Sequence, residues 1–346
     1  MCLIKLIRKR KIEESRFSGA VKRHSKSDEC LMCGRKITSP CNSHVVPQFV
    51  LKGIAENGYV SYGHALNKTN VGGIKKTTGI NNAYTFRLLC ERCEHKYFKH
   101  YENPDNILGF NLLTESEQKI ILCEMALKTH LAHIAMKYER LIAMDIASCG
   151  RLSKAEKDGL VLADRLDINE HLHYKTKLKG AMKSNKNPFV ILYDKLLDYG
   201  TKIATQTIIN YNFDLNGNQI FDPDLLIKSN QCRYFYLMIL PMKGKTRVMF
   251  YIEREYLNVA NVLPIVKDFK ALSDDEKLHF LFISLIIHDE QFYLTPSFGD
   301  MIFKKDKRLV RLYSSTDISG GKSTDCQMKI IKFREYANYL SKEYSA

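Results

Sequence analysis

The chain has 346 residues, of which 45% are hydrophobic and 26% are charged, and its formal net charge is +15 at pH 7. This is the composition of a globular protein, and the length exceeds the size at which one hydrophobic core keeps growing, so we expect two domains. No apolar run approaches the roughly 18 residues of a membrane span, and Lys5 interrupts the apolar start, so we expect no membrane partner, no secretory signal and a cytoplasmic, reducing location.

The secondary structure can be predicted in chain order. Residues 1–29 are basic and are expected to form either a short helix or an arm without fixed structure. Residue types and turn signals then predict a strand entering a turn or short helix over 43–51, a weak hairpin over 53–82, a strand over 84–89 and a helix over 91–101.

Residues 105–346 are predicted to be a second region that mixes helices and strands. Capping-box patterns begin helices at Thr114 and Ser273. The first helix is expected to run to about Met144, because apolar residues recur at helical spacing. The remaining predictions are a helix over 152–166, either a helix or a strand over 189–205, and a hairpin whose strands, 233–240 and 247–253, flank a six-residue connection.

Positive charge is concentrated at the start of the chain. Residues 1–104 hold nineteen Lys and Arg against eight Asp and Glu, a net charge of +11, whereas residues 105–346 have a net charge of +4. Because phosphate contacts provide most of the affinity of proteins for nucleic acids, this distribution favours DNA as a partner of the first region. A solvated basic surface without a partner is the alternative.

Two CxxC pairs lie in this basic region, separated by fifty-six residues: Cys30-Leu-Met-Cys33 and Cys90-Glu-Arg-Cys93. In a reducing compartment such pairs are metal ligands or redox sites more often than disulfides. Four thiolates suit tetrahedral Zn²⁺, and the two-residue spacer lets both sulfurs of a pair reach one ion. We therefore predict a closed structural zinc site that ties distant segments together. A redox-active dithiol is the alternative.

Motifs around these cysteines resemble those of the HNH endonuclease family. They are Ser43-His44-Val45-Val46-Pro47, between the two pairs, and Leu89-Cys90-Glu-Arg-Cys93-Glu94 at the second pair. The resemblance covers about 70 of the 346 residues. Within the family, the motifs resemble those of the prokaryotic, defence- or restriction-type subset, which has two zinc knuckles. It implies an α+β fold in which 30–104 form a ββα-metal, treble-clef-like nuclease domain. A larger α+β domain, 105–346, would then sense a trigger, select a target, or bind a partner protein or a second copy.

The resemblance also implies a role for each residue of the site. His44 takes the place of the general base that removes a proton from the attacking water, a task for which imidazole has a suitable pKa. Glu94 takes the place of the helical ligand of a catalytic Mg²⁺ or Mn²⁺, with His95 and Glu102 as further candidates. Asn82 is the candidate for the asparagine that orients the base.

Two departures from the family pattern affect these expectations. Ser43 stands where the family has an acidic ligand, and Glu94 stands where it has a histidine. Either the ligand types have been exchanged between strand and helix, or the metal has been lost and the scaffold kept. The sequence thus predicts a metal-dependent endonuclease that hydrolyses DNA phosphodiester bonds in defence or restriction. The alternative is a non-catalytic zinc module that binds nucleic acid or a partner.

Overall fold

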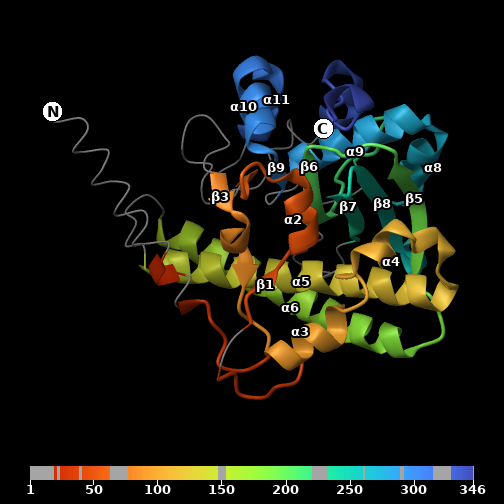
Figure 1. Ribbon diagram of the computed structural model, residues 1–346. Helices are drawn as coiled ribbons and strands as arrows, with labels where there is room; N and C mark the ends of the chain where they lie inside the picture. Colours follow the sequence, from red (N-terminus) through yellow and green to blue (C-terminus); the bar gives the residue numbers. More distant parts are fainter. Residues whose placement is uncertain are drawn as a thin grey trace.

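The computed structural model describes residues 19–21, 24–38, 41–62, 77–146, 153–219, 233–259, 262–288, 292–314 and 329–345. Most of the predicted basic arm, residues 1–29, lies outside this part of the chain. Within the described ranges no helix is long and apolar enough to cross a bilayer. Helices and an antiparallel sheet are both present, which confirms a mixed α and β fold of the kind expected (Figure 1).

A seven-stranded sheet forms the centre of the molecule, and all its pairings are antiparallel. The strand order is β3-β2-β9-β6-β7-β8-β5. Its strands are β2 (Tyr59–Tyr62), β3 (Thr77–Gly79), β5 (Phe189–Leu197), β6 (Ile203–Ile209), β7 (Phe235–Met242), β8 (Lys245–Glu253) and β9 (Tyr293–Leu294). The range 189–205, which the sequence left open between helix and strand, therefore forms β5 and the start of β6.

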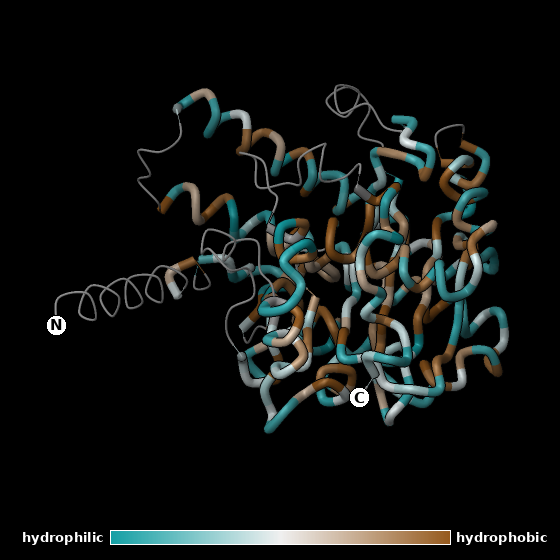
Figure 2. The backbone as a smooth tube through the Cα atoms, turned by 90° about the horizontal axis from the view of Figure 1, so that it is seen from above, coloured by the Kyte–Doolittle hydropathy of each residue, from teal (hydrophilic) through white to brown (hydrophobic). Residues whose placement is uncertain are grey.

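The sheet is buried on both faces. Along β7, Tyr236 and Met238 face one hydrophobic cluster, whereas Leu237 and Ile239 face another, as the alternation of a strand requires. Helices α5 (Glu115–Ile146) and α6 (Lys154–Lys183) contribute to the first cluster, and α8 (Leu263–Ala271) and α9 (Asp274–His288) to the second. Figure 2 shows hydrophobic and hydrophilic segments alternating along the chain.

Further helices complete the described part of the chain, and the first of them packs against β6 and β7. They are α2 (Gln48–Ile54), α3 (Glu91–Phe98), α4 (Pro104–Leu108), α10 (Pro296–Lys305) and α11 (Lys307–Ser314), with short 3-10 turns at Ile80–Asn82, Phe110–Leu112, Arg254–Tyr256, Lys329–Glu335 and Lys342–Tyr344. Two further strands, β1 (Ser43–His44) and β4 (Thr85–Phe86), form a separate antiparallel pair. The helix predicted over 91–101 thus ends three residues early, at Phe98.

Capping boxes start the long helices. The Thr114 Oγ1 accepts from the Glu117 amide at 3.4 Å while the Glu117 carboxylate accepts from the Thr114 amide at 2.9 Å, and α5 begins there as predicted. Ser273 begins α9 in the same way. A third box at Ser153 begins α6, which continues to Lys183. The predicted helix over 152–166 was therefore too short.

Strands β7 and β8 form the predicted hairpin, but two residues connect them instead of six. Lys243 and Gly244 have φ angles of +51° and +73°. Two consecutive positive φ angles are typical of the type I′ turn, whose twist matches that of paired strands. Because such a turn needs only two residues, Pro241 and Thr246 are absorbed into the ladder, where they face each other.

We expect Gly244→Ala to lower the free energy of unfolding by about 1 kcal/mol, because a side chain is strained at this positive φ. Urea denaturation measures the change. Gly159→Ala is the matched control: Gly159 lies inside α6, and a Cβ there meets nothing within 4 Å. That substitution should raise the free energy of unfolding by about 0.5–1 kcal/mol. Changes of the same sign in the two variants would contradict the turn assignment.

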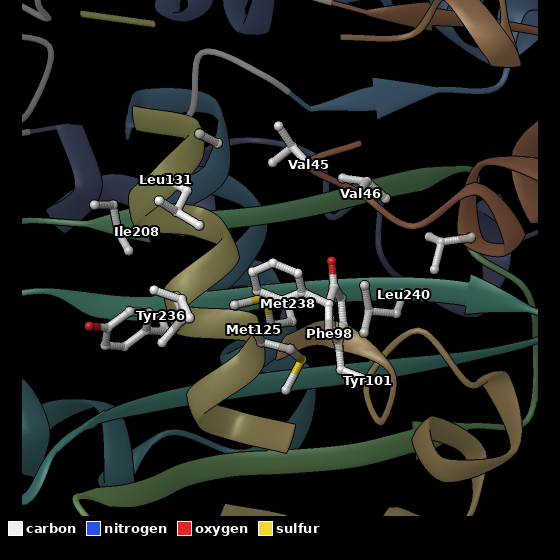
Figure 3. Close-up of a cluster of buried hydrophobic side chains, with 14 of the residues drawn as sticks. Val45, Val46, Phe98, Tyr101, Met125, Leu131, Ile208, Tyr236, Met238 and Leu240 are labelled. Atoms are coloured by element: carbon white, nitrogen blue, oxygen red, sulfur yellow. The ribbon is translucent and has the colours of Figure 1, made fainter. Parts of the chain in front are cut away.

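The first 104 residues share their core with the rest of the chain. Strand β2 pairs with β9, so that Ser61 lies opposite Leu294. One hydrophobic cluster contains Val45 and Phe98 as well as Met125 and Met238. Figure 3 shows these side chains gathered around α5, which lies across the sheet. The boundary predicted at residues 104/105 therefore does not separate two hydrophobic cores.

Candidate functional site

The four cysteines of the two CxxC pairs come together, as the sequence predicts. Their sulfur atoms all lie within 4.8 Å of one another, and the cluster could hold a metal ion. The first pair lies on a tight turn that ends at Gly34, whose φ angle is +69°. The amide of Gly34 donates to the Cys30 carbonyl at 2.8 Å. In the second pair, Cys90 is the N-cap of α3, and Cys93 lies in the first turn.

Backbone amides prepare one of these sulfurs for a metal. Burial raises the pKa of the Cys30 thiol, but hydrogen bonds from amide groups of both CxxC pairs outweigh burial and bring the pKa down to about 7. A thiolate, rather than a thiol, is the form that binds a metal. Two lysines of α6 hold the first pair in place: Lys175 donates to the Leu31 carbonyl at 3.1 Å, and Lys179 to the Met32 carbonyl at 2.8 Å.

Strands β1 and β4 and helix α3 bring Ser43 and Glu94 together. In the β1–β4 pair, Ser43 lies opposite Phe86 and His44 opposite Thr85. The buried Ser43 hydroxyl donates to Oε2 of Glu94, on the first turns of α3. The two positions that depart from the family pattern are therefore in direct contact.

The imidazole of His44 lies next to the backbone of Ile80. Its Nε2 atom is buried and has no hydrogen-bond partner among the described residues. Burial, with the charge of Lys128, lowers the pKa of His44 below 6.5, although Ile80 and Glu94 oppose the change. The lowered pKa favours the neutral imidazole, which is the form required of a general base.

Lys128, on α5, lies directly behind Glu94. Its side chain is fully buried, and the ammonium contacts Oε1 of Glu94 and lies 3.2 Å from Oε1 of Glu102. The ammonium also lies 4.2 Å from the centre of the Phe98 ring, a cation–π distance. The sequence analysis did not identify this lysine.

Glu102 is the more accessible of the two carboxylates, with 36% of its side chain exposed. Burial, together with the negative charge of Glu94, raises the pKa of Glu102, although Lys128 opposes the change. The pKa of Glu102 is thus raised from its ordinary value and that of His44 is lowered. Two titratable groups with perturbed pKa values beside one cavity are candidates for acid–base chemistry.

His44, Glu94 and Glu102 line one cavity of about 470 Å³. We call it the His44 cavity, and it is lined by Cys41, Asn42, His44, Pro47, Gln48, Phe49, Asn81, Glu94 and Glu102. Its walls come from the segment around β1, from the start of α2, from the turn before β4 and from the helix that follows the second CxxC pair. His44, Glu94 and Glu102, which were predicted from separate parts of the sequence, therefore face one space.

Two predicted site residues lie elsewhere. Asn82 does not line the His44 cavity but lines an adjacent one of about 210 Å³, which also includes Lys26 and Arg87. Its neighbour Asn81 lines both cavities. His95 is exposed and lies 3.9 Å from Glu91 on the outer side of α3, because one step along a helix turns a side chain away from the face of Glu94.

The donor set does not fit the predicted catalytic Mg²⁺ or Mn²⁺. Two carboxylates beside a cavity are suitable ligands for such an ion. However, Ser43 and Lys128 occupy both oxygens of Glu94, and Lys128 also contacts Glu102. A divalent cation bridging these carboxylates would have to lie next to a buried ammonium group, and like charges at that distance repel.

The chain matches no protein-family model, no curated protein and no solved structure.

Proposed function

We propose that this protein hydrolyses phosphodiester bonds in DNA, with His44 as the general base. The observation that carries the proposal is the arrangement of His44: its buried Nε2 has no hydrogen-bond partner among the described residues, and its side chain lines a cavity together with two carboxylates. A purely structural histidine in a core normally has its buried nitrogen atoms satisfied. The order β1, β4, α3 beside a cysteine cluster supports an HNH-like scaffold.

The proposed chemistry uses a neutral imidazole as the base and a protonated carboxyl group as the acid. The His44 imidazole takes a proton from a water molecule, whose oxygen attacks the phosphorus atom. Glu102, whose raised pKa favours the protonated form, donates a proton to the oxygen that leaves. Glu94 does not touch the substrate in this scheme, since its two oxygens are held by Ser43 and Lys128.

We also propose that the metal at the cysteine cluster is Zn²⁺ with a structural role. Four sulfur ligands fill a tetrahedral shell and leave no open position for a water molecule or a substrate. The ion would join the turn at residues 30–34 to the start of α3. It would thereby fix the direction in which α3 presents Glu94.

DNA is the proposed substrate because of charge. The region of residues 1–104 has a net charge of +11. Lys26 and Arg87 line the cavity next to the His44 cavity, and the Arg87 guanidinium donates to Asn42 at 2.7 Å, so it is held at the boundary between the two. A phosphate backbone that followed this boundary would pass His44.

The test is a nicking assay on supercoiled plasmid with zinc-loaded protein, in parallel with and without Mg²⁺. We expect wild-type protein to convert supercoiled into nicked or linear DNA and His44→Ala to fail to do so. His95→Ala is the matched control, because His95 is an exposed histidine of the neighbouring helix outside the cavity, and it should cleave like wild type. Equal cleavage by wild type and His44→Ala across several DNAs would refute the proposal.

The second candidate function is DNA binding without cleavage. The contact of Ser43 and Lys128 with Glu94 favours it, because this contact takes up the carboxylate where the family pattern has a metal ligand. A binding module would retain DNA in a salt-dependent manner, and His44→Ala would leave that retention unchanged while neither protein nicked the plasmid.

A further inference from the structure

Lys128 is an unusual group to find at the base of this cavity. It lies in the middle of α5, between Met125 and Leu131 on the face that packs against the core, and its side chain is fully buried. A buried ammonium is strongly unfavourable unless it is paired and hydrogen-bonded. The pairing here consists of two carboxylates from a different helix and its following turn, and of the Phe98 ring face.

The contacts of Lys128 reproduce those expected of a bound metal ion. The ammonium bridges Glu94 and Glu102, and Ser43 holds the other oxygen of Glu94. When both glutamates are ionised, the two carboxylates and the ammonium together carry a net charge of −1. Without the ammonium, two carboxylates would face one cavity with a charge of −2, which is the situation that a hard divalent cation relieves.

We propose that the Lys128 ammonium is the resident cation of this site and holds Glu94 and Glu102 where a divalent metal would otherwise bind. It acts as a positioning residue, since its burial keeps it from touching a substrate. A consequence, which rests on the proposed function, is that hydrolysis at His44 requires no divalent cation in the cavity.

The first test measures Mn²⁺ binding and does not depend on activity. Zinc-loaded protein is titrated with Mn²⁺, and the loss of the electron paramagnetic resonance signal of free Mn²⁺ reports uptake. We expect wild type to take up none, Lys128→Met to take up one ion per chain, and Lys128→Met/Glu102→Gln to take up none. Lys119→Met is the matched control: Lys119 is a second buried lysine of α5, but it donates to the Ser184 carbonyl rather than to a carboxylate.

Several results would overturn the proposal. Folded Lys128→Met that takes up no Mn²⁺ would show that the ammonium does not occupy a latent metal site. Uptake by wild type that Glu102→Gln abolishes would show that the metal and the lysine coexist. If Lys128→Met fails to fold, it is refolded with added Mn²⁺: folding that recovers would support the proposal, and folding that does not recover would overturn it.

The second test concerns activity and separates the two proposals. Plasmid cleavage by zinc-loaded wild type is measured in buffer freed of divalent ions with a chelating resin, and again with Mg²⁺ added. Equal rates are expected. Cleavage that appears only with Mg²⁺ would overturn the metal-free consequence. Cleavage in neither buffer would overturn the proposed function, while the Mn²⁺ titration would still decide whether Lys128 is the resident cation.

Discussion

Replacing Cys93 with serine is expected to release the metal ion from the cysteine cluster and to lower the free energy of unfolding by more than about 3 kcal/mol. Structural zinc contributes apparent binding free energies of roughly 10–16 kcal/mol in small zinc-dependent modules. This chain has a large sheet and two hydrophobic clusters in addition to the cysteine cluster, so only part of that free energy should be lost.

The position of Cys93 makes the effect large. Its side chain is 4% exposed, and its sulfur lies within 4.8 Å of the other three. It is also the residue before Glu94, so that loss of the metal would loosen the first turns of α3 and with them the contact to Ser43 and Lys128. We therefore expect the variant to lose plasmid cleavage as well as stability.

Metal content by mass spectrometry and thermal unfolding would measure both effects. Cys123→Ser is the matched control, since Cys123 is a fully buried cysteine of α5 outside the cluster. It should lose some stability through the buried hydroxyl but retain the metal. A Cys93→Ser protein with the same metal content as wild type would show that the four sulfurs do not form the binding site.

Spacing in the sequence was sufficient to predict the cysteine cluster and one side of the cavity. The two-residue spacers predicted that the sulfurs would converge. The separation of Glu94 and Glu102 by eight residues placed both near one helix face, and both line the His44 cavity although α3 ends between them. Local patterns of this kind succeed because they depend on the geometry of one turn or one helix.

The contact of Lys128 with Glu94 could not be predicted from spacing in the sequence. Lys128 meets Glu94 across 34 positions, and this contact exists only because α5 docks against α3. The sequence did contain one signal, which is a lysine within the apolar stripe of a predicted helix. Such a residue requires a buried partner, but the spacing on α5 does not reveal which segment supplies the partner.

The shared sheet was beyond sequence reasoning for a related reason. Strand β2 has four residues and β9 has two, so neither has enough length for a periodic pattern to identify it with certainty. Their pairing joins positions more than 200 residues apart. The sequence therefore could not show that Val45 and Met238 belong to one hydrophobic cluster.

The pH dependence of cleavage is expected to be bell-shaped, with its optimum on the acid side of neutrality. His44 must be neutral to accept a proton, so the rate falls as the pH drops through its pKa, which burial and Lys128 lower from 6.5. Glu102 must be protonated to donate, so the rate falls as the pH rises through its pKa, which burial and Glu94 raise from 4.5. The optimum of such a profile lies midway between the two pKa values.

Two substitutions test which residue causes each decline in the pH profile. Glu102→Gln should lower the maximal rate by a factor of about 10² to 10⁴ and remove the decline at higher pH, because the amide cannot supply the proton. His44→Ala should lower the rate by a similar factor and remove the decline at lower pH. Measurement of kcat/KM on a short duplex between pH 4.5 and 8 would detect both changes.

Glu91→Gln is the matched control for the carboxylate. Glu91 lies on α3 like Glu94 but is exposed and lines neither cavity, so its variant should keep the wild-type rate and both limbs. If Glu102→Gln keeps the decline at higher pH, another group protonates the leaving oxygen. Glu102 contacts Lys128 as well as the cavity, so its replacement could also disturb the structure. A structural disturbance would lower the rate without changing the shape of the pH profile. The decisive measurement is therefore whether the decline at higher pH disappears.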